Sequence, residues 1–86
     1  LKGQVAIVTG AGAGIGRAIS ELFAEAGAAV VVSDLKKEAA DAVAAGIARS
    51  GARAVGVACD VTRADARRAL VDAAVDAFGK VTILVN

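Results

Sequence analysis

The apolar residues of this chain change their spacing several times. Short runs of β-branched and small apolar residues alternate with stretches of helical periodicity, and Gly, Asp or Thr marks each change. The pattern predicts strands over residues 4–9, 29–33, 52–59 and 81–85. It predicts helices that begin near residue 15, span about 36–50, and follow residue 62. Strands that are apolar on both faces and alternate with helices are typical of a parallel sheet covered on both sides, so we expect an α/β fold.

Each predicted helix has an apolar face and a glycine where it should end. The first is expected to bury one face and to end at Gly27, the second to end at Gly51, and the third to begin with Thr62 as N-cap, three residues before Asp65, and to end at Gly79. The faces expected to be buried comprise Ile15, Ala18, Ile19, Leu22, Phe23 and Ala26 in the first helix, Ala39, Val43 and Ile47 in the second, and Leu70, Ala74 and Phe78 in the third.

The composition excludes several classes of protein. With 57% apolar and 22% charged residues, the chain is too apolar to be disordered. Its longest run without a charged residue, 3–16, is shorter than the ~20 apolar residues that cross a bilayer, so no membrane span is expected. The net charge of +1 comes from interleaved signs, which makes nucleic acid an improbable partner. A lone cysteine and no basic leader favour a reducing cytoplasm.

A glycine-rich loop follows the first predicted strand. Four of the ten glycines fall at Gly10, Gly12, Gly14 and Gly16. A strand that runs into a helix through glycines brings backbone N–H groups and the positive end of the helix dipole to one point, which suits a pyrophosphate group. The alternative is that these glycines serve only tight turns and close helix packing.

The spacing of these glycines separates families of phosphate-binding loops. G-x-G-x-x-G fails because Ile15 and Arg17 stand where a glycine is required, and the P-loop pattern fails from every glycine of the loop. The pattern that matches is T-G-x-x-x-G-I-G, from Thr9 to Gly16. Asp34 lies at the end of the second predicted strand. Its spacing from the glycine loop along the sequence is close to the ~20 residues expected of a carboxylate that accepts hydrogen bonds from the adenosine ribose hydroxyls. Asp34 could equally be an ordinary N-cap of the next helix.

Together with this loop and Asp34, two later segments resemble the short-chain dehydrogenase/reductase family. These are Cys59-Asp60-Val61-Thr62 and the end of the chain, from Phe78-Gly79 through Ile83-Leu84-Val85-Asn86. The resemblance implies a Rossmann-type three-layer fold with strand order 3-2-1-4, here with four strands and three helices. It makes residues 1–86 an incomplete NAD(P)-binding domain. Thr82 departs from the family, which often has Asp there, and this puts a supporting contact to the sheet in doubt.

The resemblance also implies roles for single residues. The loop would hold pyrophosphate, Asp60 would accept from the adenine amino group, the Val61 backbone would lie beside the ring, and Asn86 would lie near the cofactor ribose. Members that use NADP tend to carry a basic residue at the positions of Ala13 or Leu35, so NAD is favoured over NADP. The full set of expected cofactor-binding residues is Gly10, Gly12, Ala13, Gly14, Ile15, Gly16, Asp34, Leu35, Cys59, Asp60, Val61 and Asn86.

The family transfers hydride between a nicotinamide and an alcohol or carbonyl, with a Ser and a Tyr-x-x-x-Lys pair that follow the fourth strand. The chain contains no Tyr, so we expect no catalytic residue of this kind within it. We also expect no metal site. Two interpretations remain open: the cofactor-binding part of a longer oxidoreductase, or a freestanding βα module that has a structural or simple nucleotide-binding role. The fourth strand has no charge or proline to protect its edge, which predicts a homo-oligomer that forms through this strand.

Overall fold

The computed structural model describes all residues, Leu1–Asn86, and contains the four strands and three helices that the sequence predicts. In chain order they are β1 (Val5–Val8), α1 (Gly14–Glu25), β2 (Ala29–Asp34), α2 (Lys37–Arg49), β3 (Ala54–Ala58), α3 (Ala64–Phe78) and β4 (Ile83–Val85). The strands form one parallel sheet of order β3-β2-β1-β4. The predicted α/β architecture and strand order are therefore confirmed.

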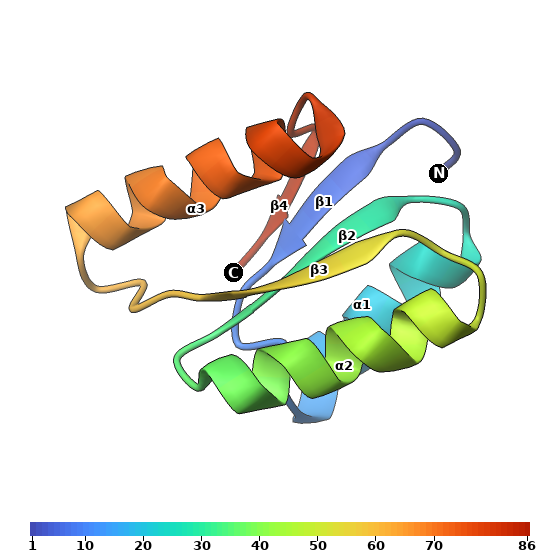
Figure 1. Ribbon diagram of the computed structural model, residues 1–86, viewed down its shortest axis with the longest axis horizontal. Helices are drawn as coiled ribbons and strands as arrows, with labels where there is room; N and C mark the ends of the chain where they lie inside the picture. The colour runs from blue at the N-terminus through green and yellow to red at the C-terminus, as the bar shows by residue number, and fades with distance from the viewer.

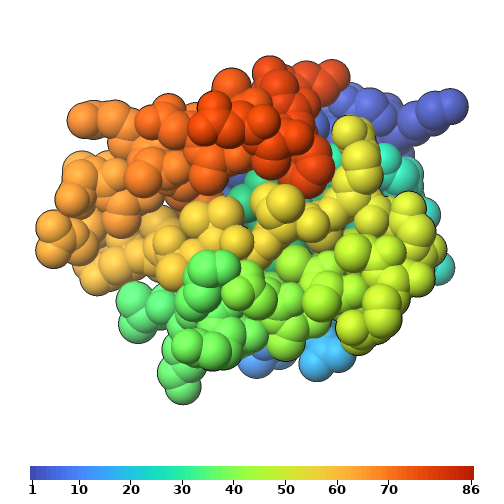
Figure 2. Space-filling model, viewed as in Figure 1, coloured from blue at the N-terminus to red at the C-terminus, as the bar shows by residue number.

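The helices divide between the two faces of the sheet. α1 and α2 cover one face and α3 the other (Figure 1). The first face holds the larger buried cluster, which includes Val30, Val32, Val43 and Ile47; the second face is buried under Leu70 and Ala74 of α3. β3 is visible as a yellow band between α3 and α2 in Figure 2. None of the helices combines the length and apolar character needed to cross a bilayer.

The apolar face predicted for α1 is only half buried. Ile19 and Phe23 pack against the core, but Ile15 is 81% exposed and Leu22 62% exposed, and Ala18 and Ala26 are also exposed. Ser20 is fully buried instead, because its hydroxyl donates to the Gly16 carbonyl oxygen (2.9 Å) and needs no other partner. The apolar stripe is wider than the strip of helix that touches the sheet.

The other two helices follow the prediction more closely. Val43 and Ile47 of α2 are buried as expected, while Ala39 is half-buried and Ala40 and Ala44 complete the contact. Gly27, Gly51 and Gly79 each have a positive φ after the helix that they end. Gly46 does not interrupt α2.

The predicted cap of α3 is wrong. Arg63 occupies the N-cap position and no side chain caps the helix. The Thr62 hydroxyl donates instead to Asp60 Oδ1 (2.6 Å), as does the Thr62 amide (3.0 Å). An N-cap hydroxyl accepts from an amide of the first helical turn, and Thr62 makes no such bond. Its two hydrogen bonds to Asp60 hold Thr62 in a turn one residue before the N-cap.

β4 is fixed to β1 by a side chain as well as by the strand ladder. The Thr82 hydroxyl accepts from the Val5 amide (2.9 Å) and lies 3.2 Å from the Val5 carbonyl oxygen, to which it donates. The supporting contact that the absence of Asp at this position put in doubt is therefore made by threonine.

Candidate nucleotide-binding site

The glycine loop lies at the carboxyl end of the sheet, between β1 and α1. It is attached to both neighbouring strands: the Thr9 amide donates to the Val85 carbonyl oxygen (3.0 Å) and the Ala11 amide to the Ser33 carbonyl oxygen (2.8 Å). Ala11 is fully buried beneath the loop. The loop is thus a fixed part of the sheet edge where ligands of open α/β folds bind.

The four glycines of the loop serve two different purposes. Gly10 and Gly14 both have a φ of +60°, and a Cβ on either would meet nothing within 4 Å. Gly12 and Gly16 have ordinary φ, but a Cβ on either would collide with neighbouring atoms. The first pair therefore gives the chain its turn and faces open space, whereas the second pair permits close internal packing.

The N-terminus of α1 presents unpaired backbone donors. Ala13 stands at the N-cap with no side-chain cap, and the first turn contains no acidic residue. The Arg17 amide is the first of the helix to find a backbone acceptor, the Ala13 carbonyl oxygen at 3.3 Å, so the amides of Gly14, Ile15 and Gly16 have none. Free amides and the helix dipole together favour an anion at this point.

Asp34 stands at the end of β2, beside the loop. Its Oδ1 accepts from the Lys36 amide (3.1 Å) and its Oδ2 from the Gly12 amide (3.0 Å). These two hydrogen bonds, that of Lys36 first, hold the pKa of the Asp34 carboxyl below its usual value. Asp34 is therefore a carboxylate at neutral pH, and it is not the N-cap of α2, where Lys36 stands.

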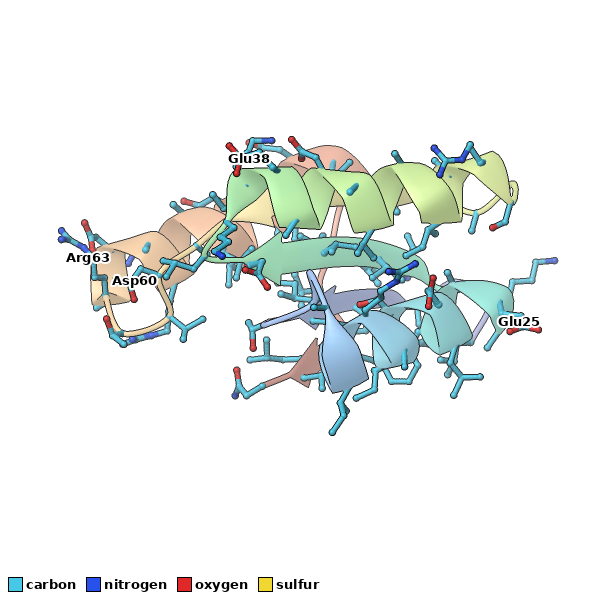
Figure 3. All side chains as sticks on the ribbon, turned by 90° about the horizontal axis from the view of Figure 1, so that it is seen from below. Glu25, Glu38, Asp60 and Arg63 are labelled. Atoms are coloured by element: carbon cyan, nitrogen blue, oxygen red, sulfur yellow. The ribbon has the colours of Figure 1, made fainter.

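The segment after β3 reaches the same edge of the sheet. The Cys59 amide donates to the Asp34 carbonyl oxygen (3.0 Å), while the Cys59 side chain is buried against Leu70 and its thiol is free. The Thr62 hydroxyl and then the Thr62 amide lower the pKa of Asp60. Figure 3 shows Asp60 at the same end of the molecule as Glu38, and Glu25 at the opposite end.

The remaining predicted residues lie around this edge with little burial. Ile15 and Leu35 are exposed, and Val61 and Asn86 line one small hollow of about 60 Å³ beside α3 together with Thr9. A larger hollow, about 720 Å³, lies at the far end of the sheet between the C-terminal turns of α1 and α2, and includes none of the predicted residues. No three His, Cys, Asp or Glu side chains are grouped so as to hold a metal ion.

Two residues of the site were not anticipated. Ala39 of α2 lies against Gly12, and the Lys36 amide occupies one oxygen of Asp34. The Asx-type turn that Asp34 forms with Lys36 is a local pattern that the residue types could have suggested. The contact with Ala39 depends on how α2 packs, so no spacing in the chain predicts it.

Comparison with known proteins agrees with this geometry. A family model described as short chain dehydrogenase matches residues 4–86. The 7alpha-hydroxysteroid dehydrogenase of Escherichia coli (strain K12) is 50% identical over 86 residues, which cover 100% of this chain and 34% of that protein. The D-threitol dehydrogenase of Mycolicibacterium smegmatis is 44% identical over 86 residues, which cover 100% of this chain and 33% of that protein. The chain thus spans about a third of the length of these curated relatives.

A solved structure resembles this one closely. It is a 7 alpha-hydroxysteroid dehydrogenase complexed with NADH and 7-oxo glycochenodeoxycholic acid, and it superposes with a TM-score of 0.97 at 50% identity. The match covers 100% of this chain and 34% of that one. The likeness therefore extends over every element described above.

Proposed function

The chain belongs to the short chain dehydrogenase family, and on that premise we propose that residues 1–86 are an incomplete NAD-binding domain, the N-terminal part of an oxidoreductase that transfers hydride between a nicotinamide cofactor and an alcohol or carbonyl. One observation carries the proposal: the loop places the left-handed Gly10 and Gly14 at the uncapped start of α1, and its Gly12 amide donates to the Asp34 carboxylate. These groups fit a pyrophosphate and a ribose joined together.

We assign the following roles to the residues of the site. The free amides at the start of α1 bind pyrophosphate, with Gly10, Gly12 and Ala13 shaping the loop. Asp34 accepts from the adenosine ribose, and Asp60, Val61 and Leu35 border the adenine, with Cys59 buried beneath them. Asn86 lies near a ribose of the cofactor. Bound NAD supplies the hydride acceptor, and the residues named here hold and orient it.

The alternative, a freestanding module with no link to catalysis, has less support. Fifty per cent identity over the full length of the chain to a dehydrogenase favours a shared cofactor role. A reducing cytoplasm remains our proposal for its location, since the lone Cys59 is a free and buried thiol.

The preference for NAD over NADP follows from charge. A 2′-phosphate beside the Asp34 carboxylate would bring two negative groups together, whereas a 2′-hydroxyl can donate to it. Lys36 is exposed next to this carboxylate, and it tempers the repulsion.

We expect Asp34→Ser to narrow the ratio of NAD to NADP affinity at least threefold, and more strongly at low salt, where screening is weaker. Titration calorimetry at two salt concentrations measures this ratio. Glu25→Ser is the matched control, because it removes the same charge at the opposite end of the molecule (Figure 3) and should leave the ratio unchanged. An unaltered ratio in Asp34→Ser would contradict the assignment.

We also propose that residues 1–86, studied on their own, associate in pairs through β4. This strand is an edge of the sheet, its Leu84 is 58% exposed, and Val71 and Val75 of α3 are exposed apolar residues on a helix that covers only part of the second sheet face. An unprotected edge with apolar neighbours is a template for pairing with a second copy.

Sedimentation is expected to give a dimer at micromolar concentration, and Leu84→Lys to weaken it at least tenfold. Leu84 is preferred to Val85 for this test, because Val85 packs against the core under α1. Ala58→Lys on β3, the opposite edge, is the control that should leave the dimer intact. A folded monomer of 8.4 kDa at that concentration would contradict the proposal.

A further inference from the structure

The glycine loop, the end of β2 and the first turn of α2 meet at Gly12. The Gly12 amide of the loop donates to Asp34 Oδ2 at the end of β2 (3.0 Å), and the same residue lies against Ala39 in α2. The loop makes one other hydrogen bond to β2, from the Ala11 amide to the Ser33 carbonyl oxygen. The loop is therefore attached to β2 at two successive residues, one of them through a side chain.

The contact is tight enough to require glycine. A Cβ on Gly12 would lie 2.6 Å from Ala39 Cβ and 2.9 Å from Asp34 Oδ2, distances that real side chains do not adopt. Gly10 and Gly14 would meet nothing under the same change. Gly12 thus differs from them: its missing side chain is needed for the protein's own contact and is not explained by the approach of a ligand.

The Asp34 carboxylate is held on both sides without any ligand. Its second oxygen accepts from the Lys36 amide (3.1 Å), so the carboxylate cannot rotate without the loss of one bond. Hydrogen bonds from backbone amides to a carboxylate are about twice as strong as those between neutral groups. The protein's own contacts therefore hold the loop in its anion-receiving form, which reduces the ordering cost of binding.

We propose that Asp34 is a positioning residue for the glycine loop as well as a contact for the nucleotide: through Gly12 its carboxylate supports the binding of phosphate groups that it does not touch. This role rests on the proposed function of the loop. A residue that acted only through the ribose would have no effect on a ligand without a ribose.

Inorganic pyrophosphate is the probe that separates these two roles. Asp34→Asn and Asp34→Ala both remove the negative charge, but asparagine keeps an oxygen that can accept from the Gly12 amide and alanine keeps none. We expect Asp34→Ala to bind pyrophosphate at least threefold more weakly than Asp34→Asn in titration calorimetry. Equal affinities in the two variants would overturn the positioning role.

Amide hydrogen exchange followed by NMR provides a measurement that needs no ligand. The Gly12 amide is expected to exchange at least tenfold faster in Asp34→Ala than in Asp34→Asn, while the Ile7 amide of the core strand keeps its protection in both and reports intact folding. Unchanged exchange at Gly12 would overturn the positioning role, whereas failure of the unaltered chain to bind pyrophosphate would overturn the anion site itself.

Discussion

Gly16→Ala is expected to lower the free energy of unfolding by about 3 kcal/mol, the upper range for a side chain forced into a packed interior. A Cβ on Gly16 would collide with the Gly10 carbonyl oxygen and lie 3.0 Å from Ala11 Cα. Both are backbone atoms of a loop bonded to β2 and β4, so they cannot move aside as a flexible side chain could. A domain of this size has little stability to lose, and a large unfolded fraction should result.

The direction of this change is informative, because alanine is ordinarily better than glycine within a helix by up to ~1 kcal/mol. Gly46→Ala in α2 is the matched control: its Cβ would meet only Arg49 Nη2, at 3.7 Å. Denaturation in urea followed by circular dichroism should show Gly46→Ala stabilised and Gly16→Ala strongly destabilised. An increase in stability for both variants would contradict the close packing of the loop on α1.

Gly14→Val is expected to weaken NAD binding at least tenfold, or about 1.4 kcal/mol. Gly14 opens α1 with a φ of +60° and faces open space, so a branched side chain there is strained and projects toward the place where we locate the pyrophosphate. Titration calorimetry measures the affinity directly.

Gly51→Val provides the control for backbone strain. Gly51 also has a positive φ, +96°, and open space around its Cβ position, but it follows α2 and borders the hollow at the far end of the sheet. The two variants should lose similar stability, yet only Gly14→Val should lose affinity. Equal affinity losses would indicate that general destabilisation, and not the loop, is responsible.

The helices and strands, and their succession along the chain, could be predicted from the sequence because they depend on local periodicity and on the glycines that end the helices. The order of the strands within the parallel sheet, 3-2-1-4, could be predicted only from the resemblance to a known family. The buried face of α1 was predicted too wide, since periodicity shows which residues are apolar and not how much of the helix the sheet can cover. Ile15 and Leu22 lie outside that contact.

The position of the candidate residues in the fold could be predicted, but the packing among them could not. Spacing located the loop and Asp34 at one edge of the sheet, yet it could not divide the glycines into the pair with positive φ and the pair in close contact. That division depends on Ala39 and on the Gly10 carbonyl oxygen, which only packing brings near. The Thr62 cap was predicted wrongly because the hydroxyl and the amide of Thr62 both donate to Asp60, which holds Thr62 in a turn one residue before the N-cap.

Titration of the ¹⁵N-labelled chain with NAD, followed by amide chemical shifts, tests the proposed function most directly. We expect saturable shifts at Gly10, Gly14, Gly16, Asp34 and Asp60, with the amides of Gly27 and Gly51 at the far hollow unchanged. Shifts confined to Gly27 and Gly51, or no saturable shift at millimolar NAD, would contradict nucleotide binding at the glycine loop.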